Sequence, residues 1–166
     1  MMHHIFLRYD QLLDDIQSQI DIVADMRPET DGSPSRTLTT ASTRYVGQFA
    51  RWINKYLDLT KSRMAAYVKT IERQNTMNAQ RPWDEAVIHL EFPPTWNATT
   101  FTNLADAVHQ YIVNGVLYEF FALSITAKDP VTSEKFEQRE EASREIKHCC
   151  VSQLPGASRK TLHPFG

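Results

Sequence analysis

The sequence predicts a mainly α-helical fold, a four-helix bundle-like domain with a small two-stranded sheet formed by residues 4–8 and 87–92. Four long segments carry apolar residues at the three- and four-residue spacing of amphipathic helices. The chain of 166 residues contains only 5 glycines, and an all-β fold would need more tight turns than these could supply. Only the two short stretches above have the length and composition of strands.

Length and composition fit one globular domain that is large enough to bury a core. Net charge is −2 and the sequence pI is about 6.3, which provides no general attraction to nucleic acid or anionic lipid. We therefore predict neither a specific nucleic-acid partner nor a membrane partner. Cys149 and Cys150 are adjacent, so they cannot cross-link distant parts of the fold. The N-terminal segment lacks the long apolar core of a secretion signal.

Residues 101–126 are predicted to form the central and most buried helix. Thr99 or Thr100 could cap its first turn, and no proline interrupts it for about seven turns. It is apolar on nearly all sides, yet polar residues interrupt it too often for a membrane span. Gly115 costs a helix interior roughly 1 kcal/mol relative to alanine, so we expect another helix to pass close there. The expected buried face contains Phe101, Leu104, Ala105, Val108, Ile112, Val116 and Leu123.

Two helices are predicted before this central one. Residues 10–26 have apolar residues at helical spacing, and Pro28 ends the helix. Residues 29–39 have the Pro, Gly and Ser content of an exposed linker, whose length hints at function or at a partner that orders it. Residues 41–74 form the longest helical pattern. Because an unbroken helix of this length would extend about 50 Å, we expect a kink near residues 59–61.

The remaining elements follow from alternation and from proline positions. Residues 75–84 read as a second polar linker. Residues 85–92 alternate between apolar and polar side chains, which predicts a strand, and residues 4–8 are its only good partner. Pro130 stands at the first position of a last helix over residues 131–154.

Residues 155–166 are predicted to be an extended C-terminal tail that follows a single domain over residues 1–154. The tail has no helical or strand period, but it combines cations with apolar side chains that are costly to leave in water. We hypothesise that it docks on a neighbouring subunit or partner protein and orders on contact. Folding back onto its own domain, or disorder, is the alternative. The partner-binding candidates are Arg159, Lys160, Leu162 and Phe165.

Two carboxylate-x-x-histidine pairs match the spacing by which helical bundles hold metals, Asp106 with His109 and Glu145 with His148. Glu145 and His148 project away from the apolar stripe of their helix, so we expect them in solvent. Asp106 and His109 lie at the margin of a buried face and could form only half a site. The cluster of His148 with the two cysteines after it cannot chelate one ion, because consecutive helical residues point in different directions. We predict no metal and no cofactor.

Glu119 falls on the apolar face of the central helix, where a carboxylate must pair or become protonated. One interpretation is a general base with a raised pKa. The other is a structural ion pair with Arg44, Arg51 or Lys55. The sequence contains no second catalytic group, no Gly-rich phosphate loop and no nucleophile elbow, so we favour a structural buried acid and predict no catalytic residue.

Several segments between Ile88 and the C-terminus carry a resemblance: IHLEFPPTW, TTFTNLADAVHQYIVNGVLYEFFALSIT, EKFEQREEASREIK and RKTLHPFG. They resemble small proteins encoded in the virion-assembly regions of phages and prophages of Bacteroidales bacteria of the gut. In the N-terminal half only FLRYDQLLDDI is similar, so the likeness covers about half the chain. The sequence departs from that pattern at Glu119-Phe120, where the family has Asp-Trp, and in a longer loop before Pro130.

The resemblance implies a structural component of the phage neck or tail, similar in size and helical content to head-to-tail connector subunits. Such a protein would assemble into a ring or onto a portal and would not be an enzyme. Its expected partners are other virion proteins or copies of itself, and its expected location is the host cytoplasm before assembly and the virion afterwards. A cytoplasmic helical-bundle binding or regulatory module is the alternative, followed by a metal-dependent helical-bundle enzyme.

Overall fold

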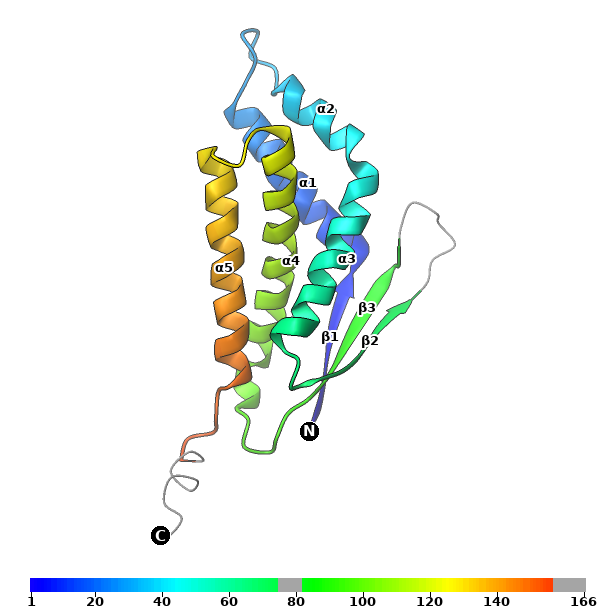
Figure 1. Cartoon of the computed structure of the whole chain (residues 1–166), viewed down its shortest axis with the longest axis vertical. Helices are drawn as coiled ribbons and strands as arrows, with labels where there is room; N and C mark the ends of the chain where they lie inside the picture. Colours follow the sequence, from blue (N-terminus) through cyan, green and yellow to red (C-terminus); the bar gives the residue numbers. More distant parts are fainter. Residues whose placement is uncertain (75–81, 157–166) are drawn as a thin grey trace.

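The computed structural model describes residues 1–74 and 82–156, which form a mainly helical body with a small antiparallel sheet along one side (Figure 1). Within these residues there are five α-helices and one three-stranded sheet. The predicted mainly helical class is therefore confirmed, and so is the presence of a small sheet. The elements are β1 (Met2–Arg8), α1 (Tyr9–Met26), α2 (Arg36–Arg44), α3 (Val46–Arg63), β2 (Val68–Gln74), β3 (Glu85–Glu91), the 3₁₀-helix η1 (Ala98–Thr100), α4 (Phe101–Ser124) and α5 (Pro130–Cys150).

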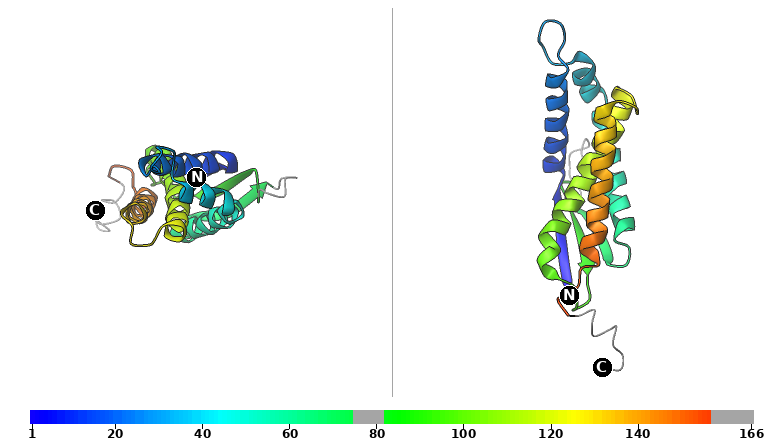
Figure 2. Two further views of the ribbon diagram at one scale, coloured as in Figure 1. Left: turned by 90° about the horizontal axis from the view of Figure 1, so that it is seen from above. Right: turned by 90° about the vertical axis from the view of Figure 1, so that its left-hand side faces the viewer.

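Helix α4 is the centre of the molecule. It packs against α5, α3 and α1, and it carries more buried residues than any other helix of the described chain (Figure 2). Val108, Ile112 and Val116 are fully buried, as predicted. Leu123 is 59% exposed, so its assignment to the buried face is wrong. It lies in the last turn of α4, where the apolar face opens onto a groove beside α2.

The start of α4 differs from the prediction that a threonine caps it. Asn97 instead caps η1, the single 3₁₀ turn that precedes α4, and its side-chain oxygen accepts the backbone N–H of Thr99 at 3.2 Å. Thr100 makes no side-chain cap bond to α4. The 3₁₀ turn supplies hydrogen bonds to the first turn that a capping side chain would otherwise provide.

The close helix approach predicted at Gly115 is confirmed. The aromatic ring of Tyr56, from α3, lies directly against Gly115, so that a Cβ atom added there would stand 2.6 Å from Tyr56 Cζ. Tyr56 is itself buried, with 1% of its surface exposed. A residue without a side chain at this point lets the two helices pack at the distance that the tyrosine ring needs.

The single long helix predicted over residues 41–74 is wrong. The segment forms α2, α3 and the strand β2 instead. Helix α3 runs through the expected kink, where the Thr60 hydroxyl donates to the Tyr56 carbonyl at 2.8 Å rather than starting a new helix. The change to strand occurs after Met64, because the β-branched residues of β2 pair with β3 and gain backbone hydrogen bonds across the sheet. Since α2 begins at Arg36, the linker predicted over residues 29–39 is also shorter than expected.

The predicted pairing of the first strand with residues 87–92 is confirmed. β1 and β3 are antiparallel, with Ile5 opposite Ile88, and β3 is the central strand of the order β1-β3-β2. The third strand, β2, was not predicted. Alternate residues of β1 and β3, including Ile5, Ile88 and Leu90, enter the same hydrophobic core as the helices. Part of the second predicted linker, residues 75–81, lies outside the described residues.

We predict that Gly115→Ala will destabilise the protein in urea unfolding by more than about 1 kcal/mol. The added methyl group would collide with the buried Tyr56 ring, and overpacking a core typically costs about 1–3 kcal/mol even though alanine favours helix.

The matched control is Gly47→Ala in α3, where a Cβ would meet no atom within 4 Å. This variant should be neutral or stabilised. Equal effects of the two substitutions would show that the contact between Gly115 and Tyr56 does not constrain the packing of α3 on α4.

Candidate functional site

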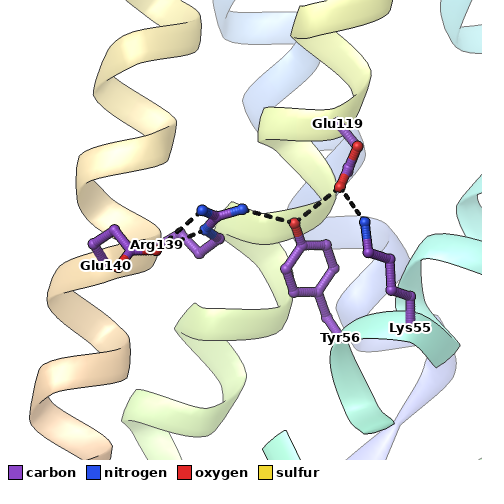
Figure 3. Close-up of polar contacts among 5 residues, drawn as sticks. All are labelled: Lys55, Tyr56, Glu119, Arg139 and Glu140. Carbon is purple, nitrogen blue, oxygen red and sulfur yellow. Dashed lines mark hydrogen bonds and ion pairs between the residues drawn. The ribbon is translucent and has the colours of Figure 1, made fainter. Parts of the chain in front are cut away.

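A chain of polar contacts links α3, α4 and α5 through Tyr56 (Figure 3). The Tyr56 hydroxyl donates to Glu119 Oε1 at 3.1 Å and accepts from Arg139 Nη1 at 3.0 Å. Lys55 Nζ pairs with the same Glu119 oxygen at 2.6 Å, and Arg139 pairs with Glu140 at 3.0 Å. Each helix therefore contributes at least one charged member to a continuous network.

The environment of this network fixes the protonation of Tyr56 and the position of Arg139. Burial raises the pKa of Tyr56, so the hydroxyl stays protonated and remains a donor to the carboxylate. The Arg139 guanidinium lies 4.7 Å from the ring centre of Phe136 and 5.0 Å from that of Tyr118. These aromatic contacts and the hydrogen bonds together hold the guanidinium in place.

Glu119 is less buried than predicted. Its side chain is 23% exposed, because the carboxylate reaches the edge of α4 where Lys55 stands at the surface. Lys55 is one of the three cations considered as partners, whereas Arg44 and Arg51 do not contact Glu119. The second contact, from Tyr56, could not be expected from charge pairing alone.

Asp106 and Glu145, one from each metal-like pair, line the same groove, but the two members of the first pair point to different places. His109 turns toward α1 and its Nε2 lies 2.5 Å from Asp15, while Asp106 lines a groove. Glu145 and His148 are exposed, as their helical positions predicted. Among the residues that the structure describes, no group of three or more His, Cys, Asp or Glu side chains could hold a metal ion.

The cysteines lie in an environment that disfavours thiolate. Burial raises the pKa of Cys149 to about 12 and that of Cys150 to about 11. The Cys149 Sγ also donates to Glu145 Oε1 at 3.4 Å, which favours the protonated thiol. Neither sulfur is therefore prepared to act as a nucleophile near neutral pH.

A groove of about 650 Å³ runs between α1, α4 and α5, and it contains a buried lysine. Lys135 is 7% exposed, and its ammonium group donates to the amide oxygens of Gln19 and Gln138, both at 3.2 Å. Burial lowers the pKa of Lys135. Sequence reasoning missed this residue, although its helical spacing from Ala142 and Ile146 places it on the buried stripe of α5.

A second groove, of about 410 Å³, lies between α2 and the end of α4. Arg36 and Arg44 stand on one side and the exposed Leu123 on the other, so the groove is basic with an apolar wall. Arg36 is near Asp31 at 3.7 Å, whereas Arg44 has no ion-pair partner within residues 1–74 and 82–156. An acidic segment with an apolar residue would complement this surface.

Comparison with known proteins gives no significant match to a family model, a curated protein or a solved structure. Among helices of the described chain, none combines the length and apolar character needed to cross a bilayer. The expected partner-binding residues Arg159, Lys160, Leu162 and Phe165 lie outside the described residues.

We predict that Tyr56→Phe will lower the free energy of unfolding by about 1–3 kcal/mol, because Arg139 and Glu119 each lose a partner in a partly buried site. Urea unfolding followed by circular dichroism measures the change. Tyr118→Phe is the control, since Tyr118 also contacts Arg139 through its ring. Equal losses in the two variants would contradict a specific role for the Tyr56 hydroxyl.

His3, in β1, is a half-buried histidine whose protonation should make the stability of the fold depend on pH. Its ring lies 5.0 Å from that of Trp96 and 5.1 Å from that of Phe101, and its buried Nε2 has no hydrogen-bond partner among the described residues. Burial, with smaller contributions from the N-terminal ammonium and His4, lowers the pKa of His3. The folded state therefore favours the neutral ring.

We predict that stability will fall as the pH drops below 6.5, the ordinary pKa of the unfolded histidine, toward the lower folded pKa. The unfolded chain binds this proton and the folded chain resists it, so the contribution is full above pH 6.5. His3→Phe should flatten the pH profile of unfolding, whereas the exposed His148→Gln should not. A profile unchanged by His3→Phe would contradict the assignment.

Proposed function

We propose that this chain is a non-catalytic virion structural or assembly protein of a phage or prophage, a neck, tail or head-to-tail connector component that acts through protein–protein contacts. The resemblance between residue 88 and the C-terminus supports the virion context. In this proposal α1, α3, α4 and α5 form a bundle-like body that presents contact surfaces to its neighbours. The protein would reside in the host cytoplasm before assembly and in the virion afterwards.

The observation that carries the proposal is the exposure of apolar side chains at both ends of an elongated molecule (Figure 1). At the end where α1 and α4 finish, Met26 is 71% and Leu123 is 59% exposed. At the opposite end, which holds the N-terminus and the end of α5, Val151 is 62% and Leu154 is 43% exposed. Large apolar groups at opposite ends fit a subunit that contacts different neighbours above and below.

The C-terminal tail adds a third contact in this proposal. Arg159 and Lys160 would reach carboxylates of a neighbour while Leu162 and Phe165 enter an apolar groove. The tail follows the end of α5, so it begins at the same end of the molecule as Val151 and Leu154. An ordered contact there would bury apolar area that both partners otherwise leave in water.

A binding or regulatory module is the second candidate, and the groove at Lys135 favours it. The ammonium group is buried in a hollow lined by polar side chains, where it donates to two neutral amides. Asp106, Glu141 and Glu145 line the same hollow, so it suits a polar small molecule that offers donors to the carboxylates and an acceptor to the ammonium group. This candidate requires a protein that stays in the cell lysate and does not enter particles.

We predict that the protein will be found in purified phage particles. In a strain whose own copy is deleted, particles should contain the chain when the full-length gene is supplied, as measured by mass spectrometry of gradient fractions. A version that ends at residue 157 should fold with unchanged helicity and melting temperature but enter particles poorly.

A second variant, Leu154→Ser, weakens the proposed apolar contact at the same end while keeping the tail, and it should also fold normally but enter particles less well. A full-length protein that is abundant in the lysate and absent from particles would contradict the virion proposal and favour the binding module. A truncated protein that unfolds would show instead that the tail belongs to the core of its own domain.

A further inference from the structure

Helix α1 presents a purely acidic face. The helix contains five aspartates and no lysine, arginine or histidine. Asp14, Asp21 and Asp25 are exposed and recur at helical spacing, so they lie along one line on the outside of the molecule. Within the described residues none of these three forms an ion pair. No cation of the described residues is therefore paired with these three carboxylates.

Helices α2 and α3 present the opposite charge. Together they contain six lysines and arginines and one acid, Asp58, which is already paired with Arg73 at 2.6 Å. Arg44, Arg51 and Lys61 are exposed, and in the part of the chain that the structure describes none of them forms an ion pair. A net charge of only −2 for the whole chain thus conceals two faces of opposite sign.

The acidic face of α1 and the basic face of α3 lie on opposite sides of the molecule, while α2 packs on α1 and crosses from one side to the other. Both α1 and α3 pack on α4, and the view from above shows them along opposite edges (Figure 2). They also occupy overlapping levels along the long axis, with the end of α1 near the level of the α2–α3 junction (Figure 1). Two copies placed side by side with parallel long axes would therefore bring the acidic face of one to the height of the basic face of the other.

Apolar side chains accompany both faces. Ile22 and Met26, which are 51% and 71% exposed, stand beside Asp21 and Asp25 on α1. Val46, which is 48% exposed, stands near Arg44 at the start of α3, and the indole of Trp52 is half-buried beside Arg51. An interface needs apolar contacts at its centre with charges that set orientation, and these two faces supply both.

We propose that copies of this chain associate side by side with parallel long axes, with the acidic α1 face of one copy against the basic face of the next, which runs from Arg44 along α3. The inference rests on the proposed function and specifies its self-association. Like faces repel, so the complementary pairing excludes a two-fold dimer built from α1 against α1 or from α3 against α3. Because the two faces differ, the contact is heterologous, and its repetition closes into a ring or extends as a filament.

Two charge-reversal variants test this pairing. The first is Asp21→Lys with Asp25→Lys, and the second is Arg44→Glu with Arg51→Glu. Each alone would bring like charges together at every interface, and its self-association at low salt should weaken on the order of 100-fold. An equimolar mixture should assemble again with alternating copies, because each face then meets its opposite. Sedimentation velocity over a range of concentrations measures both results, and circular dichroism checks the fold.

The matched control is Glu134→Lys with Glu137→Lys, which changes the net charge as much as the first variant does but on the exposed side of α5. It should assemble like the wild type. The proposal is overturned if the wild type is monomeric at low salt, if either reversed variant assembles normally, or if the mixture fails to assemble. The experiment with phage particles is independent of this one. If the wild-type protein is found in particles but is monomeric when purified, only the side-by-side contact is overturned. If the purified protein self-associates but is absent from particles, only the virion function is overturned.

Discussion

The approach of Tyr56 to Gly115 is the contact on which the arrangement of the helices depends. Without a side chain at Gly115, α3 comes near enough to α4 for the tyrosine ring to lie against the helix. That position carries the hydroxyl past α4 to the side where Arg139 stands on α5, and within reach of Glu119. One glycine thus allows one tyrosine to connect three helices, and the core residues of α4 pack around this contact.

Much of the fold could be predicted from the sequence because its strongest signals are local. The run of apolar residues identified α4, and alternation identified β3 and its partner β1. The same reasoning failed after Arg63, since Tyr67 and Ile71 are separated by four residues and fit a helix as well as a strand. Pairing with β3 decided between them, and a single-sequence pattern does not contain that long-range contact.

The candidate site was less predictable for a related reason. Periodicity identifies which positions face inward, and Glu119 was found because an acid on an apolar face is conspicuous. Its partner Lys55 was one of three equivalent choices, because the relative rotation of α3 and α4 was unknown. Lys135 was missed because most charged residues of α5 are exposed. In the sequence, a buried lysine among them cannot be distinguished from its exposed neighbours. The oppositely charged faces could not be predicted from the sequence either, because recognising them requires the positions of α1 and α3 in the folded molecule.

Strand β1 continues into α1 without a loop, Arg8 being the last residue of one and Tyr9 the first of the other. The junction is tied to the rest of the chain by the Tyr9 backbone N–H, which donates to the Asp84 carbonyl at 3.0 Å. Tilting α1 would break that bond and disturb the pairing of β1 with β3. The other end of α1 is held as well, because the guanidinium of Arg27, the residue that follows the helix, donates to both carboxylate oxygens of Asp129 at 2.9 and 2.6 Å. The acidic helix is therefore fixed at both ends, to the sheet at its start and to the segment before α5 at its finish.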